Sequence, residues 1–108
     1  MLILLKDLPK ISLNKWYAGM HWTKRKKMKD NYTQIVNSQF YKVLSKDKTY
    51  QVEYHFTFKS RPLDASNCVA MVKMIEDIIF ETDSYKVVTS LVITSRKGNS
   101  DIVEIKIN

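Results

Sequence analysis

The sequence predicts a single small α+β domain with the element order β-α-β-α-β-β. Its 108 residues are the length of one domain. Residues 50–59 alternate apolar and polar side chains, as a half-buried strand does, and residues 67–80 carry apolar side chains at helical spacing. A composition of 44% apolar and 27% charged residues is typical of a globular domain and excludes a disordered chain. We expect a mixed or antiparallel sheet with two helices on one face.

The N-terminal half predicts a strand, a loop and a long helix. Residues 2–5 form a short apolar run, and the Leu8-Pro9 step after it favours extended backbone. Residues 10–21 are polar and aromatic without a clear period, which predicts a loop. From an N-cap at Thr23, apolar residues recur every three or four positions as far as Leu44. This spacing predicts an amphipathic helix of about five or six turns.

The C-terminal half predicts a strand, a helix and two further strands. Arg61-Pro62 ends the alternating strand 50–59, and the helix 67–80 follows. Residues 86–95 and 101–107 are the last two strands, joined as a hairpin by the segment between them. The side of the second helix that faces away from its apolar stripe presents Ser66, Ala70, Lys73 and Asp77.

The charge is divided unevenly along the chain. Residues 1–50 contain eleven Lys and Arg against three Asp, whereas residues 51–108 contain seven against eight acidic residues. A basic half predicts binding to a polyanion, although a soluble protein of high pI would have the same composition. No apolar run is long enough to span a membrane. The single cysteine, Cys68, excludes an internal disulfide and a Cys-based zinc site, so we expect a cytoplasmic protein.

Basic and aromatic residues gather before and within the first predicted helix. Cations at a helix start oppose its dipole, and a bound phosphate would relieve that cost. Trp22 is a candidate for stacking on unpaired bases, or alternatively a hydrophobic contact at the helix start. The candidate DNA-binding residues are Lys15, Trp16, Tyr17, Lys24, Arg25, Lys26, Lys27, Lys29 and Arg61.

Two aspartates flank the second predicted helix. Asp64 precedes it and Asp83 follows it, and Mg²⁺ prefers carboxylate oxygens of this kind. For Asp64 the structural alternative is a helix N-cap, and for Asp83 an ordinary loop carboxylate. Lys73 is a candidate for binding a phosphate, or alternatively an i,i+4 partner of Asp77.

The order of these features resembles the RusA family of Holliday junction resolvases over nearly the whole chain. The residues that carry the likeness are Arg-x-x-Asp-x-x-Asn at 61–67, a Lys-containing helix, and the Asp-Ser step at 83–84 before a strand. The family hallmark is Asp-x-Asp-Asn-x-x-Lys, a helix, and then Asp-Asp-Ser/Ala-Gln. The segment Ser-Leu-Asn-Lys-Trp-Tyr at 12–17 is similar to the family's N-terminal loop.

This resemblance implies a homodimeric endonuclease, dependent on Mg²⁺ or Mn²⁺, that nicks four-way DNA junctions in a bacterial or phage-infected cell. Asp64 and Asp83 would be catalytic metal ligands, and Lys73 would be catalytic in place of the hallmark lysine. No small-molecule cofactor is implied. Glu76, Asp77 and Glu81 are candidate replacement ligands, of which we interpret Glu76 and Asp77 as surface charges. The chain departs from the hallmark at Ser66, Ala70 and Thr82.

These departures leave two alternatives to an active nuclease. One is a weakened or inactive relative that binds branched DNA without cutting it. The other is an unrelated basic α+β module that binds RNA or protein.

Overall fold

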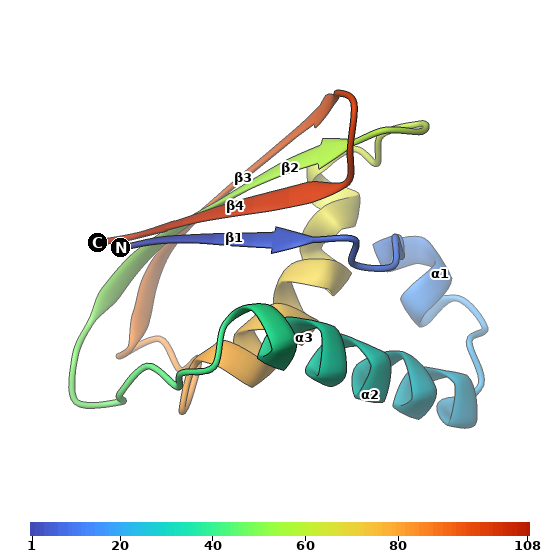
Figure 1. The fold of residues 1–108 in the computed structure, drawn as a ribbon. Coiled ribbons are helices and arrows are strands. Elements are labelled where there is room, and N and C mark those ends of the chain that lie inside the picture. Colours follow the sequence, from blue (N-terminus) through green and yellow to red (C-terminus); the bar gives the residue numbers. More distant parts are fainter.

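Helices cover one face of a four-stranded sheet in the computed structural model, which describes residues 1–108 (Figure 1). The expected small α+β domain is therefore confirmed. None of the helices has both the length and the apolar character needed to cross a membrane. The elements in chain order are β1 (Leu2–Lys6), α1 (Leu13–Tyr17), α2 (Trp22–Gln39), β2 (Tyr50–Phe58), the 3₁₀ helix η1 (Ala65–Cys68), α3 (Val69–Ile79), β3 (Val88–Lys97) and β4 (Ile102–Ile107).

The sheet is mixed, with the strand order β1-β4-β2-β3. β4 is antiparallel to both β1 and β2, whereas β3 runs parallel to β2. The predicted hairpin between the last two strands is therefore wrong, because β2 lies between β3 and β4 (Figure 1). The chain crosses the end of β2 here, and the Gly98 N–H donates a hydrogen bond to the Phe58 carbonyl at 2.9 Å.

Gly98 is needed at this crossing because its backbone passes close to Thr57. A Cβ atom at Gly98 would lie 2.4 Å from Thr57 Cγ2. Thr57 Oγ1 also accepts a hydrogen bond from Arg96 Nε at 3.1 Å, which holds the side chain in place. We expect Gly98→Ala to lower the free energy of unfolding by about 1–3 kcal/mol, measured by urea denaturation.

The double variant Thr57→Ala/Gly98→Ala tests the cause, since it removes the clashing methyl group. Adding Gly98→Ala to Thr57→Ala should therefore lower the free energy of unfolding much less than Gly98→Ala does in the original chain. If Gly98→Ala and the original chain have equal free energies of unfolding, the backbone around Gly98 accommodates the added methyl group without destabilising the fold.

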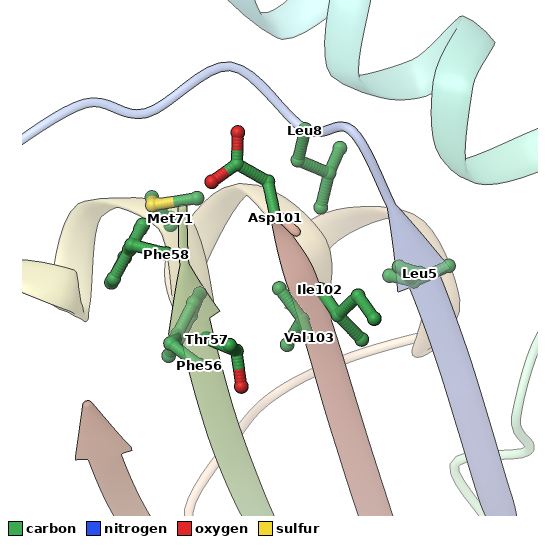
Figure 2. Close-up of a pocket in the computed structure, with 9 residues that line it drawn as sticks. All are labelled: Leu5, Leu8, Phe56, Thr57, Phe58, Met71, Asp101, Ile102 and Val103. Atoms are coloured by element: carbon green, nitrogen blue, oxygen red, sulfur yellow. The ribbon is translucent and has the colours of Figure 1, made fainter. Parts of the chain in front are cut away.

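The core lies between the sheet and the helices. Alternate strand residues point toward the helices, and the inward-facing positions of β2 are all buried. A small cavity of about 10 Å³ lies at one end of this core, and Figure 2 shows the mostly apolar side chains that line it, among them Leu5, Phe56 and Met71. Asp101 lines the same cavity, and its carboxylate accepts from the Lys59 N–H at 3.0 Å. This space is about that of one water molecule, so we assign no ligand to it.

Two details of the N-terminal half differ from the sequence-based expectation. The loop expected over residues 10–21 contains α1, which begins where the Ser12 hydroxyl accepts from the Lys15 N–H at 3.1 Å. The N-cap of α2 is His21, not Thr23, and its ring nitrogen accepts from the Thr23 N–H at 3.3 Å. Both helix starts thus have a side-chain cap that satisfies a backbone donor.

The long helix also ends earlier than expected. α2 stops at Gln39, and Phe40 has extended backbone. Leu44, the expected end, is buried and joins Phe80 in a parallel bridge, with its N–H donating to the Ile79 carbonyl at 2.7 Å. Leu44 therefore continues the helical spacing but serves tertiary packing, whereas Val43 is exposed.

Candidate functional site

Cationic and aromatic side chains from α1 and α2 contact one another. The Arg25 guanidinium lies 5.6 Å from the ring centre of Trp16 and 6.0 Å from that of Tyr17. The Lys29 ammonium lies 5.9 Å from the Trp16 ring centre. These are cation–π distances. The residues Lys15, Trp16, Tyr17, Trp22, Lys24, Arg25, Lys26, Lys27 and Lys29 are called the α1–α2 surface below.

Most of this surface is open to solvent. The side chains of Trp22 and Tyr17 are 68% and 67% exposed, so the alternative of a hydrophobic contact for Trp22 does not describe its position. An open depression nearby is lined by Lys15, His21 and Lys24 among others. Of the lysines and arginine here, only Lys26 has an acidic partner, Asp30 at 3.3 Å. The surface therefore keeps most of its positive charge.

α1 lies against η1 and the start of α3, and α2 lies against α3. Lys29 of α2 and Asp77 of α3 line the same shallow depression. The predicted basic residues and the predicted acidic residues are thus carried by elements in direct contact. Arg61 is exposed in the connector before η1, and its carbonyl accepts from Lys10 Nζ at 2.7 Å.

Asp64 stands at the start of η1 with a free carboxylate. Its carbonyl accepts from the N–H groups of Asn67 and Cys68 at 2.8 and 3.2 Å, but its side chain makes no capping hydrogen bond. The segment is fixed to β3 because the Ser95 hydroxyl donates to the Leu63 carbonyl at 2.5 Å. Asp64 occupies the expected cap position, yet its exposed carboxylate remains available to a ligand.

Lys73 and Asp83 form an ion pair, with 2.8 Å between Lys73 Nζ and Asp83 Oδ2. The hydrogen bond to Asp83 raises the pKa of Lys73. The alternative pairing of Lys73 with Asp77 is not what the structure shows. Two of the three predicted catalytic residues therefore meet, whereas no hydrogen bond or ion pair joins Asp64 to either of them.

Glu76 is buried, and our interpretation of it as a surface charge was wrong. The residue is 4% exposed, and it is the only charged residue in the core. Its Oε2 atom and the nearby Tyr54 hydroxyl are both buried without a hydrogen bond of good geometry. Burial raises the pKa of Glu76 to about 7, with Asp83 and Asp77 adding to the rise and Lys73 opposing it.

The sequence did contain a signal for this burial. Val72, Glu76 and Ile79 are spaced by four and three residues, so they lie on one helix face, and all three are buried. Ala70, which was expected on the opposite side, is also buried, at 2% exposure. The position where the family resemblance expects a lysine is therefore closed to solvent. Ser66, Lys73 and Asp77 are exposed as expected.

The acidic residues offer oxygen ligands of the type that Mg²⁺ prefers. No group of three or more His, Cys, Asp or Glu side chains is arranged to hold a metal ion. Two carboxylates are enough for Mg²⁺ when water and phosphate complete its coordination. Near Asp83 and Lys73, one carboxylate oxygen of Glu76 makes no hydrogen bond of good geometry and could bind a metal ion. The donor set therefore fits a hard divalent cation.

Among known proteins, neither a family model nor a curated sequence matches this chain. Its function has to be argued from its own residues.

Proposed function

We propose that this protein is a Mg²⁺-dependent endonuclease that binds four-way DNA junctions and cuts them. The observation that supports the proposal is that α1 packs against η1 and α3, and α2 against α3, so the basic surface is carried by elements that contact those carrying or adjoining Asp64, Lys73 and Asp83. A polyanion held by the basic residues would thereby reach the acidic ones. Both the junction specificity and the family assignment rest on the sequence resemblance.

The α1–α2 surface supplies the two kinds of contact that branched DNA requires. Lys24, Lys27 and Lys29 have no acidic partner and would contact phosphates irrespective of sequence. The exposed rings of Tyr17 and Trp22 would stack on bases that are unpaired at the branch point. Sequence-independent charge and stacking together favour a structure-specific ligand.

The catalytic assignment follows the predicted roles of the acidic residues. Asp83 and Asp64 are the metal ligands that the resemblance implies, and a bound Mg²⁺ would supply an activated water and neutralise charge on the scissile phosphate. Lys73, once free of Asp83, would donate to the same phosphate. A homodimer would present two such sites to the two-fold symmetric junction.

Cleavage of a labelled four-way junction, with and without Mg²⁺ or Mn²⁺, tests the proposal. We expect metal-dependent nicking at symmetric positions, and a loss of at least about 100-fold in rate for Asp83→Asn and Asp64→Asn. Both variants should still bind the junction. Asp30→Asn, which removes an exposed carboxylate of α2, is the matched control and should cut normally.

Two results would contradict the proposal in different ways. Unchanged cleavage by Asp64→Asn or Asp83→Asn would remove the site assignment. Equal binding to branched and linear duplex would remove the junction specificity and favour a general basic module.

A second candidate function is binding of branched DNA without cleavage. It is favoured by the burial of Ala70, by the lack of a carboxylate at Ser66 and Thr82, and by the Lys73–Asp83 ion pair, which already neutralises one predicted ligand. The same assay separates the candidates, since this protein would shift the junction in a gel but leave it intact with either metal.

A further inference from the structure

The side chain of Glu76 is the one buried charged group that the fold itself does not explain. A carboxylate that is 4% exposed, with one oxygen that makes no hydrogen bond of good geometry, is costly unless something else binds it. The Tyr54 hydroxyl lies beside it, and it too makes no hydrogen bond of good geometry. Unsatisfied buried groups in native proteins commonly mark a bound ion, a water or a catalytic role.

The surroundings of Glu76 favour a cation as the missing partner. Lys73 is three residues away on α3, so both side chains project from the same side of the helix. The Lys73 ammonium lies 2.8 Å from Asp83 Oδ2, and its positive charge also acts on Glu76, with which it forms no ion pair. Lys73 is exposed and has a long flexible stem, so its ammonium can move away without disturbing the core.

We infer that Glu76 and Asp83 together form a divalent-cation site, which Lys73 occupies in the absence of the ion. This inference rests on the proposed function in taking Mg²⁺ as the working ion, and it adds Glu76 as a carboxylate ligand beside Asp83. On metal binding Asp83 exchanges the ammonium for the ion, and the released Lys73 is free to contact a phosphate. Two carboxylates with water and phosphate are an ordinary coordination set for Mg²⁺.

Binding of Mn²⁺ to the DNA-free chain tests the site directly. The free Mn²⁺ signal is measured by electron paramagnetic resonance for the original protein and for the variants Glu76→Gln, Asp83→Asn, Lys73→Met and Asp30→Asn. We expect one bound ion, and at least about 10-fold weaker binding for Glu76→Gln and Asp83→Asn. Lys73→Met should bind several-fold more tightly, because the competing ammonium is gone. Asp30→Asn, which removes an exposed carboxylate outside the site, should stay within about twofold.

Circular dichroism of each variant shows whether it is folded, and Glu76→Asp replaces Glu76→Gln if the latter is not. The inference is overturned if the Glu76 variant binds Mn²⁺ like the original protein, or if Asp30→Asn weakens binding as much as the Glu76 variant does. It is also overturned if the original protein binds no Mn²⁺. Normal Mn²⁺ binding with no junction cleavage would instead contradict the proposed nuclease and support the site.

Discussion

At pH 8, Glu76→Gln is expected to raise the free energy of unfolding by about 3 kcal/mol in metal-free buffer. The pKa of Glu76 rises from 4.5 to about 7 on folding, mainly through burial. The folded chain therefore holds this proton more tightly than the unfolded chain. The stability that the protonated Glu76 side chain provides is complete below pH 4.5, declines as the pH rises and is lost above pH 7. Gln is neutral throughout and keeps that stability.

Urea denaturation at pH 4 and pH 8 measures this difference. The two proteins should have nearly equal stability at pH 4, and the advantage of Glu76→Gln should appear only at higher pH. Asp77→Asn removes an exposed carboxylate from the same helix and should leave most of the pH dependence in place. A variant less stable than the original chain at pH 8 would show that the ionised carboxylate has a favourable partner in solution.

Junction binding should weaken on the order of 100-fold when Lys24, Lys26, Lys27 and Lys29 are all replaced by Gln. Each phosphate contact releases condensed counterions from DNA, so the slope of log K against log salt should become shallower by about 3 to 4. The slope distinguishes this cause from misfolding, which would lower the concentration of active protein without changing the salt dependence. Fluorescence anisotropy at several salt concentrations provides both quantities.

A control with the same change in net charge is available elsewhere on the chain. Replacing Lys42, Lys48, Lys86 and Lys106 by Gln also removes four positive charges, but none of these residues lies on α1 or α2. We expect an affinity loss of less than about tenfold and a nearly unchanged slope. Equal losses in both variants would mean that net charge, and not the α1–α2 surface, determines binding.

The elements that could be predicted from the sequence are those encoded by local spacing. The alternation of residues 50–59 predicted the bounds of β2 to within one residue, because apolar and polar side chains in a strand occupy opposite faces of the sheet. α1 was missed because five residues are too few to show a period. The pairing of β3 was missed because a short connection resembles a hairpin turn whether or not the strands it joins are neighbours.

The candidate site was less predictable, because its contacts depend on tertiary structure. Lys73 and Asp83 are ten residues apart, and they meet because the chain turns back after the end of α3. Glu76 was assigned to the surface from its residue type, although its spacing from Val72 and Ile79 places it on the buried face. The position of Glu76 on the helix therefore predicted its burial better than its charge did.

The place of β1 in the sheet has a consequence for folding during synthesis. β1 pairs with β4 alone, in contacts such as Leu2 with Lys106, and the Met1 amino group donates to the Ile107 carbonyl at 2.8 Å. β1 therefore has no strand partner until residues 102–107 have also left the ribosome. Contacts between such distant segments slow folding, and the waiting strand exposes an unpaired edge meanwhile. Nascent chains stalled before residue 102 should accordingly be bound by chaperones and cut by proteases more readily than chains that include β4.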